Sequence, residues 1–159
     1  MLIDFTIRLA TIKDAKAVHE ILLDAFEEYR SFYSPEGFTD TVLSEEKAKD
    51  RIKDMKVYVA VDQHSKIIGT IGWQKLNKYE GHIRGMGVIP SRQGKRSPAM
   101  SLLKCVERDA QLEKCKILTL DTTEILKRAQ KFYEKNGYKR TGKIGDFFGS
   151  IIYEFAKTL

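Results

Sequence analysis

One basic loop carries the residue types that could bind phosphate. It follows a short strand, turns at Pro90, contains Gly94 and leads into an amphipathic helix near Pro98. Exposed backbone amides before a helix, together with the positive end of the helix dipole, attract anions. Charged and polar side chains add stronger bonds to phosphate. The loop therefore predicts a site for the diphosphate of a coenzyme, with these candidates: Arg92, Gln93, Gly94, Lys95, Arg96, Ser97 and Pro98.

The same loop has a simpler interpretation, a solvated basic turn at the start of a helix. Pro98 lacks an N–H, which removes one amide from the site, but it suits the first turn of a helix that Ser97 caps. The net charge of +6 favours an anionic partner such as nucleic acid, an anionic surface or a coenzyme, or it only keeps the chain in solution.

Cysteine and histidine positions predict neither a metal site nor a disulfide framework. Cys105 and Cys115 are not near a histidine at metal spacing, and His19, His64 and His82 are scattered. We expect two buried thiols and no metal. The chain has no run of about 18 apolar residues and no signal-peptide pattern, so we expect a cytoplasmic protein that does not span a membrane.

Hydrophobic periodicity predicts one α+β domain (mixed α/β) over residues 1–159. Alternating or short apolar runs predict strands at residues 5–9, 57–62, 67–73, 81–88, 117–121, 138–144 and 150–156. Helical spacing predicts helices at residues 11–29, 45–55, 98–112 and 124–136. The sum is a mixed sheet of six to seven strands with about four helices, in which residues 81–121 form a parallel strand-helix-strand unit.

An aromatic segment, residues 30–41, is predicted as a loop because it contains Pro35 and Gly37. Its aromatic residues Phe32, Tyr33 and Phe38 either pack back onto the domain or form the wall of a pocket for a second substrate.

Two motifs and the order of the elements resemble the GNAT superfamily of N-acetyltransferases over essentially the whole chain. The family's acetyl-CoA signature follows a strand ending in Val-x-Pro and then reads Q/R-x-x-G-x-G/A; here Val88-Ile89-Pro90 and residues 93–98 stand at these positions. Residues 129–138, AQKFYEKNGY, are similar to the family's A-x-x-F-Y-E-K-x-G-F segment. Arg96 and Pro98 replace the two loop glycines of the family. Leu126 stands where many relatives have an asparagine that contacts the coenzyme.

The resemblance implies an acetyl-CoA-dependent N-acetyltransferase that moves acetyl directly from CoA to an amine. Tyr133 matches a tyrosine that protonates the CoA sulfur in many members, although it could merely pack under the sheet beside Phe132. His82 stands where similar enzymes often carry a glutamate that acts as a base through water, and an imidazole suits that role. Glu80, Glu28 and water alone are the alternatives to His82.

The central strand is expected to hold the pantetheine. The resemblance assigns Met86 and Val88 to its amides and the backbone N–H groups around Gly87 to the oxyanion. Gly85 and Gly87 fit either a close approach of a ligand or packing against a helix. Strand alternation places Arg84, Met86 and Val88 on the face of His82.

The acceptor and the assembly stay open at this level. A small amine, a protein N-terminus or a lysine could accept the acetyl group, and a homodimer is one option for the assembly. The competing function is a module without catalysis, which senses CoA or binds RNA through its basic surface. We regard nucleic acid as the less favoured partner.

Overall fold

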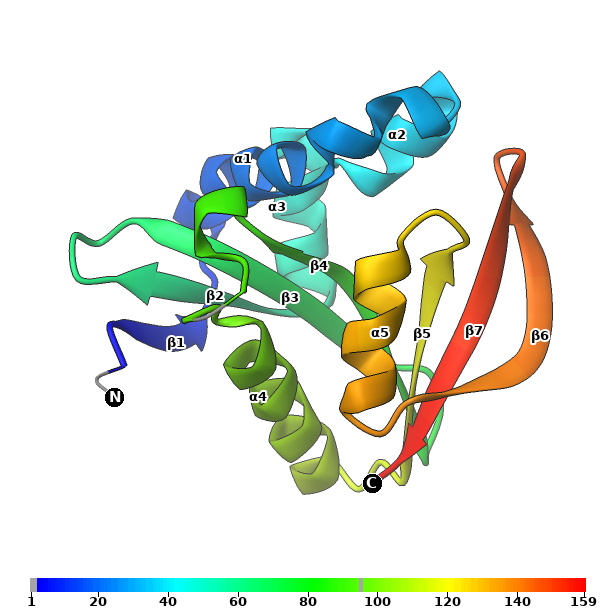
Figure 1. Ribbon diagram of the computed structural model, residues 1–159. Coiled ribbons are helices and arrows are strands. Elements are labelled where there is room, and N and C mark those ends of the chain that lie inside the picture. The colour runs from blue at the N-terminus through cyan, green and yellow to red at the C-terminus, as the bar shows by residue number, and fades with distance from the viewer. Residues whose placement is uncertain (1–2, 95) are drawn as a thin grey trace.

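A seven-stranded mixed sheet runs through the computed structural model, which describes residues 3–94 and 96–159 (Figure 1). The strand order is β1-β2-β3-β4-β5-β7-β6, and only β4 and β5 pair in parallel among these strands. The strands are β1 Phe5–Leu9, β2 Lys56–Asp62, β3 Ile67–Lys75, β4 Glu80–Val88, β5 Ile117–Thr123, β6 Lys139–Phe147 and β7 Ser150–Thr158. The expected fold class and the parallel pairing of β4 with β5 are confirmed.

Helices cover both faces of the sheet, with α1 to α3 on one side and α4 and α5 on the other (Figure 1). The α-helices of the described residues are α1 Ala15–Phe26, α2 Pro35–Thr41, α3 Glu45–Asp54, α4 Ala99–Leu112 and α5 Lys127–Lys135. Short 3-10 helices are η1 Ile12–Asp14, η2 Glu27–Phe32 and η3 Pro90–Arg92. No helix in the described part of the chain is long and apolar enough to cross a membrane.

Helix α2 corrects the prediction of a loop at residues 30–41. The hydroxyl of Ser34 accepts a hydrogen bond from the amide of Gly37 at 3.1 Å, and Pro35 occupies the first helical position. Both features favour a helix start. The segment is short and has a polar sequence, so its hydrophobic periodicity does not reveal the helix.

The apolar sides of the long helices form the core, as their spacing predicts. On α1 the buried residues include Val18 and Leu22, and on α4 Leu102, Leu103 and Val106 are fully buried. Burial of each such side chain stabilises the fold by about 1.5–3 kcal/mol. The packing therefore fixes both helix layers against the sheet.

The start of α4 lies one residue later than predicted. Pro98 is the N-cap residue and Ala99 the first helical residue, while the hydroxyl of Ser97 accepts a hydrogen bond from the amide of Ala99 at 3.1 Å. Ser97 thus still satisfies one amide of the helix start.

Strands β4 and β5 separate partway along their length. Residues 80–83 of β4 pair with residues 117–120 of β5, and the two strands diverge after Ile83 and Leu120 (Figure 1). The edge of β4 at Met86 to Val88 therefore has no partner strand on the β5 side. Its backbone groups on that side can pair with an extended ligand.

A β-bulge in β4 decides which residues share a face. The register jumps from Thr70 opposite Gly87 to Gly72 opposite Arg84, and Gly85 has a positive φ of 74°. An extra residue in one strand shifts the alternation of its side chains. His82 and Arg84 consequently lie on the side of α1 to α3.

Met86 and Val88 lie on the opposite side of the sheet from His82. The sulfur of Met86 contacts Tyr133 of α5, and the Cγ2 atom of Val88 lies near Gly69, where side chains of Pro98 and Leu102 also meet. The prediction that both residues share the face of His82 is therefore wrong, because the bulge was not visible in the sequence.

Candidate active site

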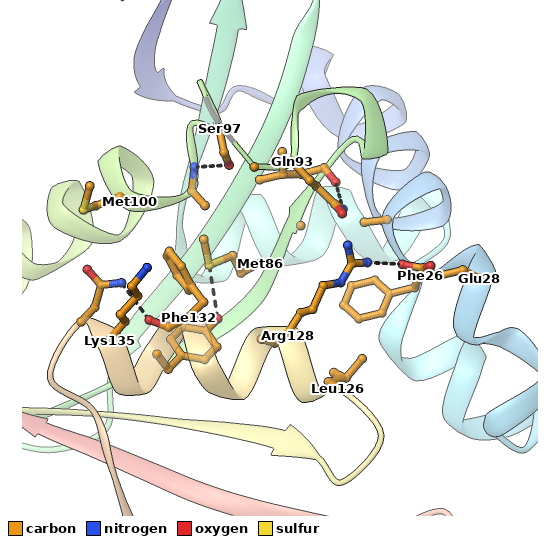
Figure 2. Close-up of a pocket in the computed structure, with 18 of the residues that line it drawn as sticks. Phe26, Glu28, Met86, Gln93, Ser97, Met100, Leu126, Arg128, Phe132 and Lys135 are labelled. Atoms are coloured by element: carbon orange, nitrogen blue, oxygen red, sulfur yellow. Dashed lines mark hydrogen bonds and ion pairs between the residues drawn. The ribbon is translucent and has the colours of Figure 1, made fainter.

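A cavity of about 790 Å³ lies where β4 leaves β5. Its walls come from the end of α1, the edge of β4, the loop after β4 and one side of α5 (Figure 2). Met86, Gln93 and Ser97 face Leu126 and Phe132 across it (Figure 2). Its volume is in the range of cavities that bind cofactor-sized ligands.

The basic loop forms one end of this cavity. Gln93, Gly94, Arg96 and Ser97 line it, whereas Pro98 is buried outside it and Lys95 lies outside the described residues. Gly94 has a φ of 89°, and no other atom lies within 4 Å of the position that a Cβ would take there. Within the described residues, the amides of Gly94 and Arg96 donate no hydrogen bond. The loop therefore presents open backbone beside the start of α4, as an anion requires.

Two loop side chains are engaged within the protein. Arg92 pairs with Asp4 at 2.6 Å and does not line the cavity, so the expectation that it supplies charge to a phosphate is wrong. The amide nitrogen of Gln93 donates to the carbonyl of Val88 at 3.0 Å. That carbonyl oxygen keeps a second lone pair for a further donor.

Helix α5 adds cations that the sequence had not singled out. Arg128 and Lys135 line the cavity, and Arg128 pairs with Glu28 at 2.6 Å (Figure 2). Glu28, an alternative base, thus lines the first cavity and forms an ion pair with an arginine. The basic character of residues 127–135 was a signal, but only the fold brings α5 next to the loop.

Tyr133 lies at the boundary between this cavity and a second one. It is only 7% exposed, and its hydroxyl donates a hydrogen bond to the Sδ atom of Met86 at 3.2 Å (Figure 2). Burial raises the pKa of the Tyr133 hydroxyl. The phenol therefore stays protonated at neutral pH. Its neighbour Phe132 is less buried, so Tyr133 is the member of the pair that faces inward.

The second cavity, of about 390 Å³, extends to the side of α1 to α3. It shares five lining residues with the first, listed here: Phe26, Met86, Leu126, Ala129 and Tyr133. Its charged lining residues are Asp40, Arg51, Arg84 and Asp121, together with His82. Two differently lined cavities thus adjoin at Met86 and Tyr133.

His82 faces this second cavity from β4. Its Nδ1 atom lies 2.8 Å from the hydroxyl of Thr119, and its Nε2 atom lies 3.6 Å from a carboxylate oxygen of Asp121. Burial lowers the pKa of His82, while the charge of Asp121 opposes this effect. The imidazole is therefore neutral at pH 7 and can accept a proton. Glu80, the other alternative base, lines neither cavity.

The sequence did not identify Thr119 and Asp121 as partners of His82. Both follow from the register that places His82 opposite Thr119 in the parallel pair. Asp121 shares the face of Thr119 because side chains two residues apart in a strand point the same way.

The three aromatic residues of segment 30–41 differ in position, and Phe32 takes neither of the two predicted roles. Tyr33 and Phe38 are buried in the core, whereas Phe32 is 61% exposed. Tyr33 also lines the second cavity, and its hydroxyl lies 2.8 Å from that of Thr123. One residue of the three thus forms part of a pocket wall.

Several solved structures share this fold. They include the PaiA N-acetyltransferase of Thermoplasma acidophilum in complex with coenzyme A, with 21% identity and a TM-score of 0.80 over 98% of this chain and 99% of that chain. A GNAT acetyltransferase of Elizabethkingia anophelis with acetyl-CoA bound has 18% identity and a TM-score of 0.71 over 98% and 99%. An acetyltransferase of Streptococcus agalactiae has 16% identity and a TM-score of 0.77 over 99% and 100%.

Sequence comparison assigns the family. No curated protein matches the sequence significantly. The profile of the acetyltransferase (GNAT) family matches residues 16–138, which include β4, the basic loop, α4 and α5. The chain therefore belongs to the acetyltransferase (GNAT) family.

Proposed function

We propose that the protein transfers acetyl directly from acetyl-CoA to an amine while both substrates are bound. The observation that carries this proposal is the junction of the two cavities at Met86 and Tyr133. One cavity ends at the basic loop with its open amides, and the other contains a histidine whose pKa burial lowers. Structures of the same fold with coenzyme A or acetyl-CoA bound support this assignment.

The first cavity would hold acetyl-CoA. The open amides of the basic loop, the side chains of Arg96 and Ser97 and the start of α4 would bind the diphosphate, with Lys95 as a further cation. Met86 and Val88 would pair with the pantetheine amides through the edge of β4 that β5 leaves uncovered. Pro98 would contribute only by fixing the direction of α4.

The second cavity would hold the acceptor and contain the base. An amine with a pKa near 10 must lose a proton before it attacks the thioester carbonyl. His82 would take this proton, directly or through water, and Asp121 would stabilise the resulting imidazolium. Backbone N–H groups around Gly87 would stabilise the oxyanion that forms on the carbonyl.

Tyr133 would act on the leaving group. As nitrogen bonds to the carbonyl carbon and the bond from carbon to sulfur breaks, the sulfur gains negative charge. The phenol would transfer its proton to this sulfur, so that CoA leaves as a thiol; the phenolate would then regain a proton from solvent, and His82 would release the proton taken from the amine to solvent. Its hydroxyl already donates to a sulfur atom, that of Met86.

The expected location is the cytosol. Cys105 and Cys115 are free thiols in the structure. Unpaired thiols are typical of a reducing compartment.

Ligand-induced stabilisation tests the proposed function. At one hundred times its Kd, acetyl-CoA should stabilise the fold by about 2.7 kcal/mol. For a chain of this size this corresponds to a rise in Tm of roughly 5–10 °C. Arg96→Ala should reduce this shift, whereas Arg108→Ala, on the exposed side of α4, should not. Release of free CoA thiol with a library of amines then measures turnover.

The same measurement distinguishes the transferase from the two competing functions, an RNA-binding module and a CoA sensor. A generic RNA should give no comparable shift. A shift with RNA that weakens steeply with salt, with none from acetyl-CoA at millimolar concentration, would replace the transferase by a nucleic-acid-binding module. A shift with acetyl-CoA but no turnover with any amine would instead favour a CoA sensor.

A further inference from the structure

Arg51 of α3 stands out among the arginines near the second cavity. Its guanidinium lines that cavity and lies against the bulge of β4, in the space that a Cβ of Gly85 would occupy. Within residues 3–94 and 96–159, it makes no hydrogen bond or ion pair. Arg84, its neighbour in the cavity, is instead paired with Asp40 at 3.3 Å.

An arginine in this half-buried position favours an anionic partner. A guanidinium carries five N–H donors and stays charged at neutral pH. Burial and the nearby charge of Arg84 lower the pKa of Arg51 to about 10, and the charge of Asp40 offsets this only in part. Arg51 is therefore still a cation at pH 7, in a partly desolvated site that the protein leaves unneutralised. Charge without a partner is unfavourable there.

The charges of the second cavity are distributed unevenly. Arg51 and Arg84 provide positive charge on the side of α3 and α2, and Asp40 neutralises one of them. Asp121 and the neutral His82 lie on the strands β5 and β4. Such a cavity matches a ligand that has a negative group at one end and an ammonium group at the other.

We propose that the acceptor is a small amino acid, whose carboxylate binds Arg51 while its amine lies toward His82 and Asp121. This inference rests on the proposed transferase function and specifies its substrate. A carboxylate matches the planar fork of a guanidinium with two parallel hydrogen bonds. A cavity of about 390 Å³ is large enough for such a molecule. A simple amine or polyamine would leave Arg51 unpaired and place a second cation near it.

Matched pairs of acceptors test the inference. The panel contains α-, β- and γ-amino acids, each beside its own carboxamide, and the readout is release of CoA thiol. At least one amino acid should show a kcat/KM about 10- to 100-fold above that of its amide, which is the usual range for a hydrogen-bonded charge. Arg51→Gln should lower kcat/KM for that amino acid by a similar factor, mainly through KM, and remove the preference over the amide. Arg108→Gln, outside both cavities, should change neither value.

Several results would overturn the inference. These are equal or better use of the amides, an unchanged preference in Arg51→Gln, or no thiol release with any amino acid. In each case stabilisation by acetyl-CoA, together with release of CoA thiol in the presence of a simple amine or a carboxamide, shows that the transferase function survives, because acetyl-CoA occupies the other cavity. If Arg51→Gln no longer binds acetyl-CoA, Arg51→Lys takes its place. Lysine keeps the positive charge but cannot form two parallel hydrogen bonds. A preference for the amino acid over its amide that is reduced but not lost in Arg51→Lys supports the inference. An unchanged preference contradicts it.

Discussion

The hydroxyl of Tyr133 is the polar group placed at the junction of the two cavities. It donates to the sulfur of Met86, and burial raises its pKa, so it keeps its proton at neutral pH. A phenol in this state already holds the proton that a leaving thiolate needs, so it does not first have to take up a proton from solvent. The aromatic ring also packs edge to face against Tyr138, with 5.7 Å between ring centroids.

Tyr133→Phe should separate these two roles. We expect kcat to fall by about 10²-fold, within the range for loss of a positioned acid, while acetyl-CoA affinity stays unchanged because the ring is retained. Steady-state kinetics and ligand-induced thermal shifts measure the two quantities. Tyr138→Phe is the matched control, since its hydroxyl bonds to Glu107 and lines neither cavity. Unchanged turnover in Tyr133→Phe would remove this residue from catalysis.

His82 should set the acidic limb of the pH profile. Burial places its pKa below 6.5, so the neutral, proton-accepting form predominates at pH 7 and is lost as the pH falls below the lowered pKa. The charges of Asp121, Glu154 and Glu80 raise this pKa, and that of Arg84 lowers it. Asp121→Asn should therefore move the limb of kcat/KM to lower pH.

His82→Gln provides the second half of this test. With one acceptor used throughout, we expect kcat/KM at pH 7 to fall by about 10²-fold and the limb assigned to His82 to disappear. A limb that stays at the same pH in both variants would assign the base to another group or to water.

At the scale of elements, the bulge in β4 connects the fold to the site. Gly85 allows the strand to change face, and its missing side chain leaves room for the guanidinium of Arg51. Gly87 serves packing instead, because a Cβ there would lie 3.3 Å from Leu22 and Ala25 of α1. Of the two explanations for these glycines, packing is the one that the contacts of Gly87 favour.

Gly85→Ala should disturb both the backbone and Arg51. A non-glycine residue at positive φ costs roughly 1–2 kcal/mol, and the displaced guanidinium adds to this. Gly142→Ala is the matched control, because Gly142 has a φ of 94° but no atom near its missing Cβ. Urea unfolding should show a larger loss of stability for Gly85→Ala. Equal losses would mean that Arg51 moves aside without cost.

At the scale of the whole molecule, two carboxylates of α4 join it to the sheet. Glu107 accepts hydrogen bonds from the hydroxyl of Tyr138 at 3.0 Å and from Lys157 at 2.8 Å. Asp109 accepts hydrogen bonds from the indole of Trp73 and the hydroxyl of Tyr58, both at 2.9 Å. These bonds connect the helix with β2, β3, β7 and the segment after α5.

Acid should weaken these connections. Burial alone would raise the pKa of Glu107 and Asp109, but the lysines and the other donors outweigh it, so both pKa values lie below normal. The stabilisation is therefore complete above the unfolded-state pKa of about 4 and is lost as pH falls through the lower folded-state values. Urea unfolding should show a decline in stability below about pH 4 from these two carboxylates, in addition to a separate decline between pH 6.5 and the lowered pKa of His82, whose neutral form the fold favours.

Glu107→Gln identifies the source of this decline. We expect a loss of about 1–3 kcal/mol at pH 7, because Lys157 loses its charged partner, and a shallower dependence on pH below 4. An unaltered pH dependence would assign the acid sensitivity to other carboxylates.

The homodimer stays a prediction, which light scattering of the purified protein tests.

The sequence by itself determined the strands, the long helices and the basic loop before α4. These features depend on local properties, namely hydrophobic period, capping residues and glycine or proline positions, which are readable over 5 to 15 residues. The resemblance added Tyr133 and His82 as candidates, and the fold places both beside a cavity. Helix α2 was not predicted because so short a segment has too few turns to show a helical period of apolar residues.

Only the tertiary structure decided which side chains meet. Arg92 pairs with Asp4, 88 residues earlier, and His82 contacts Thr119, 37 residues later. Arg51 reaches the bulge at Gly85 only because α3 packs on that face of the sheet. Such contacts depend on strand register and on the bulge, which are set by packing between distant segments. Local sequence does not specify that packing, so the second cavity could not be predicted from it.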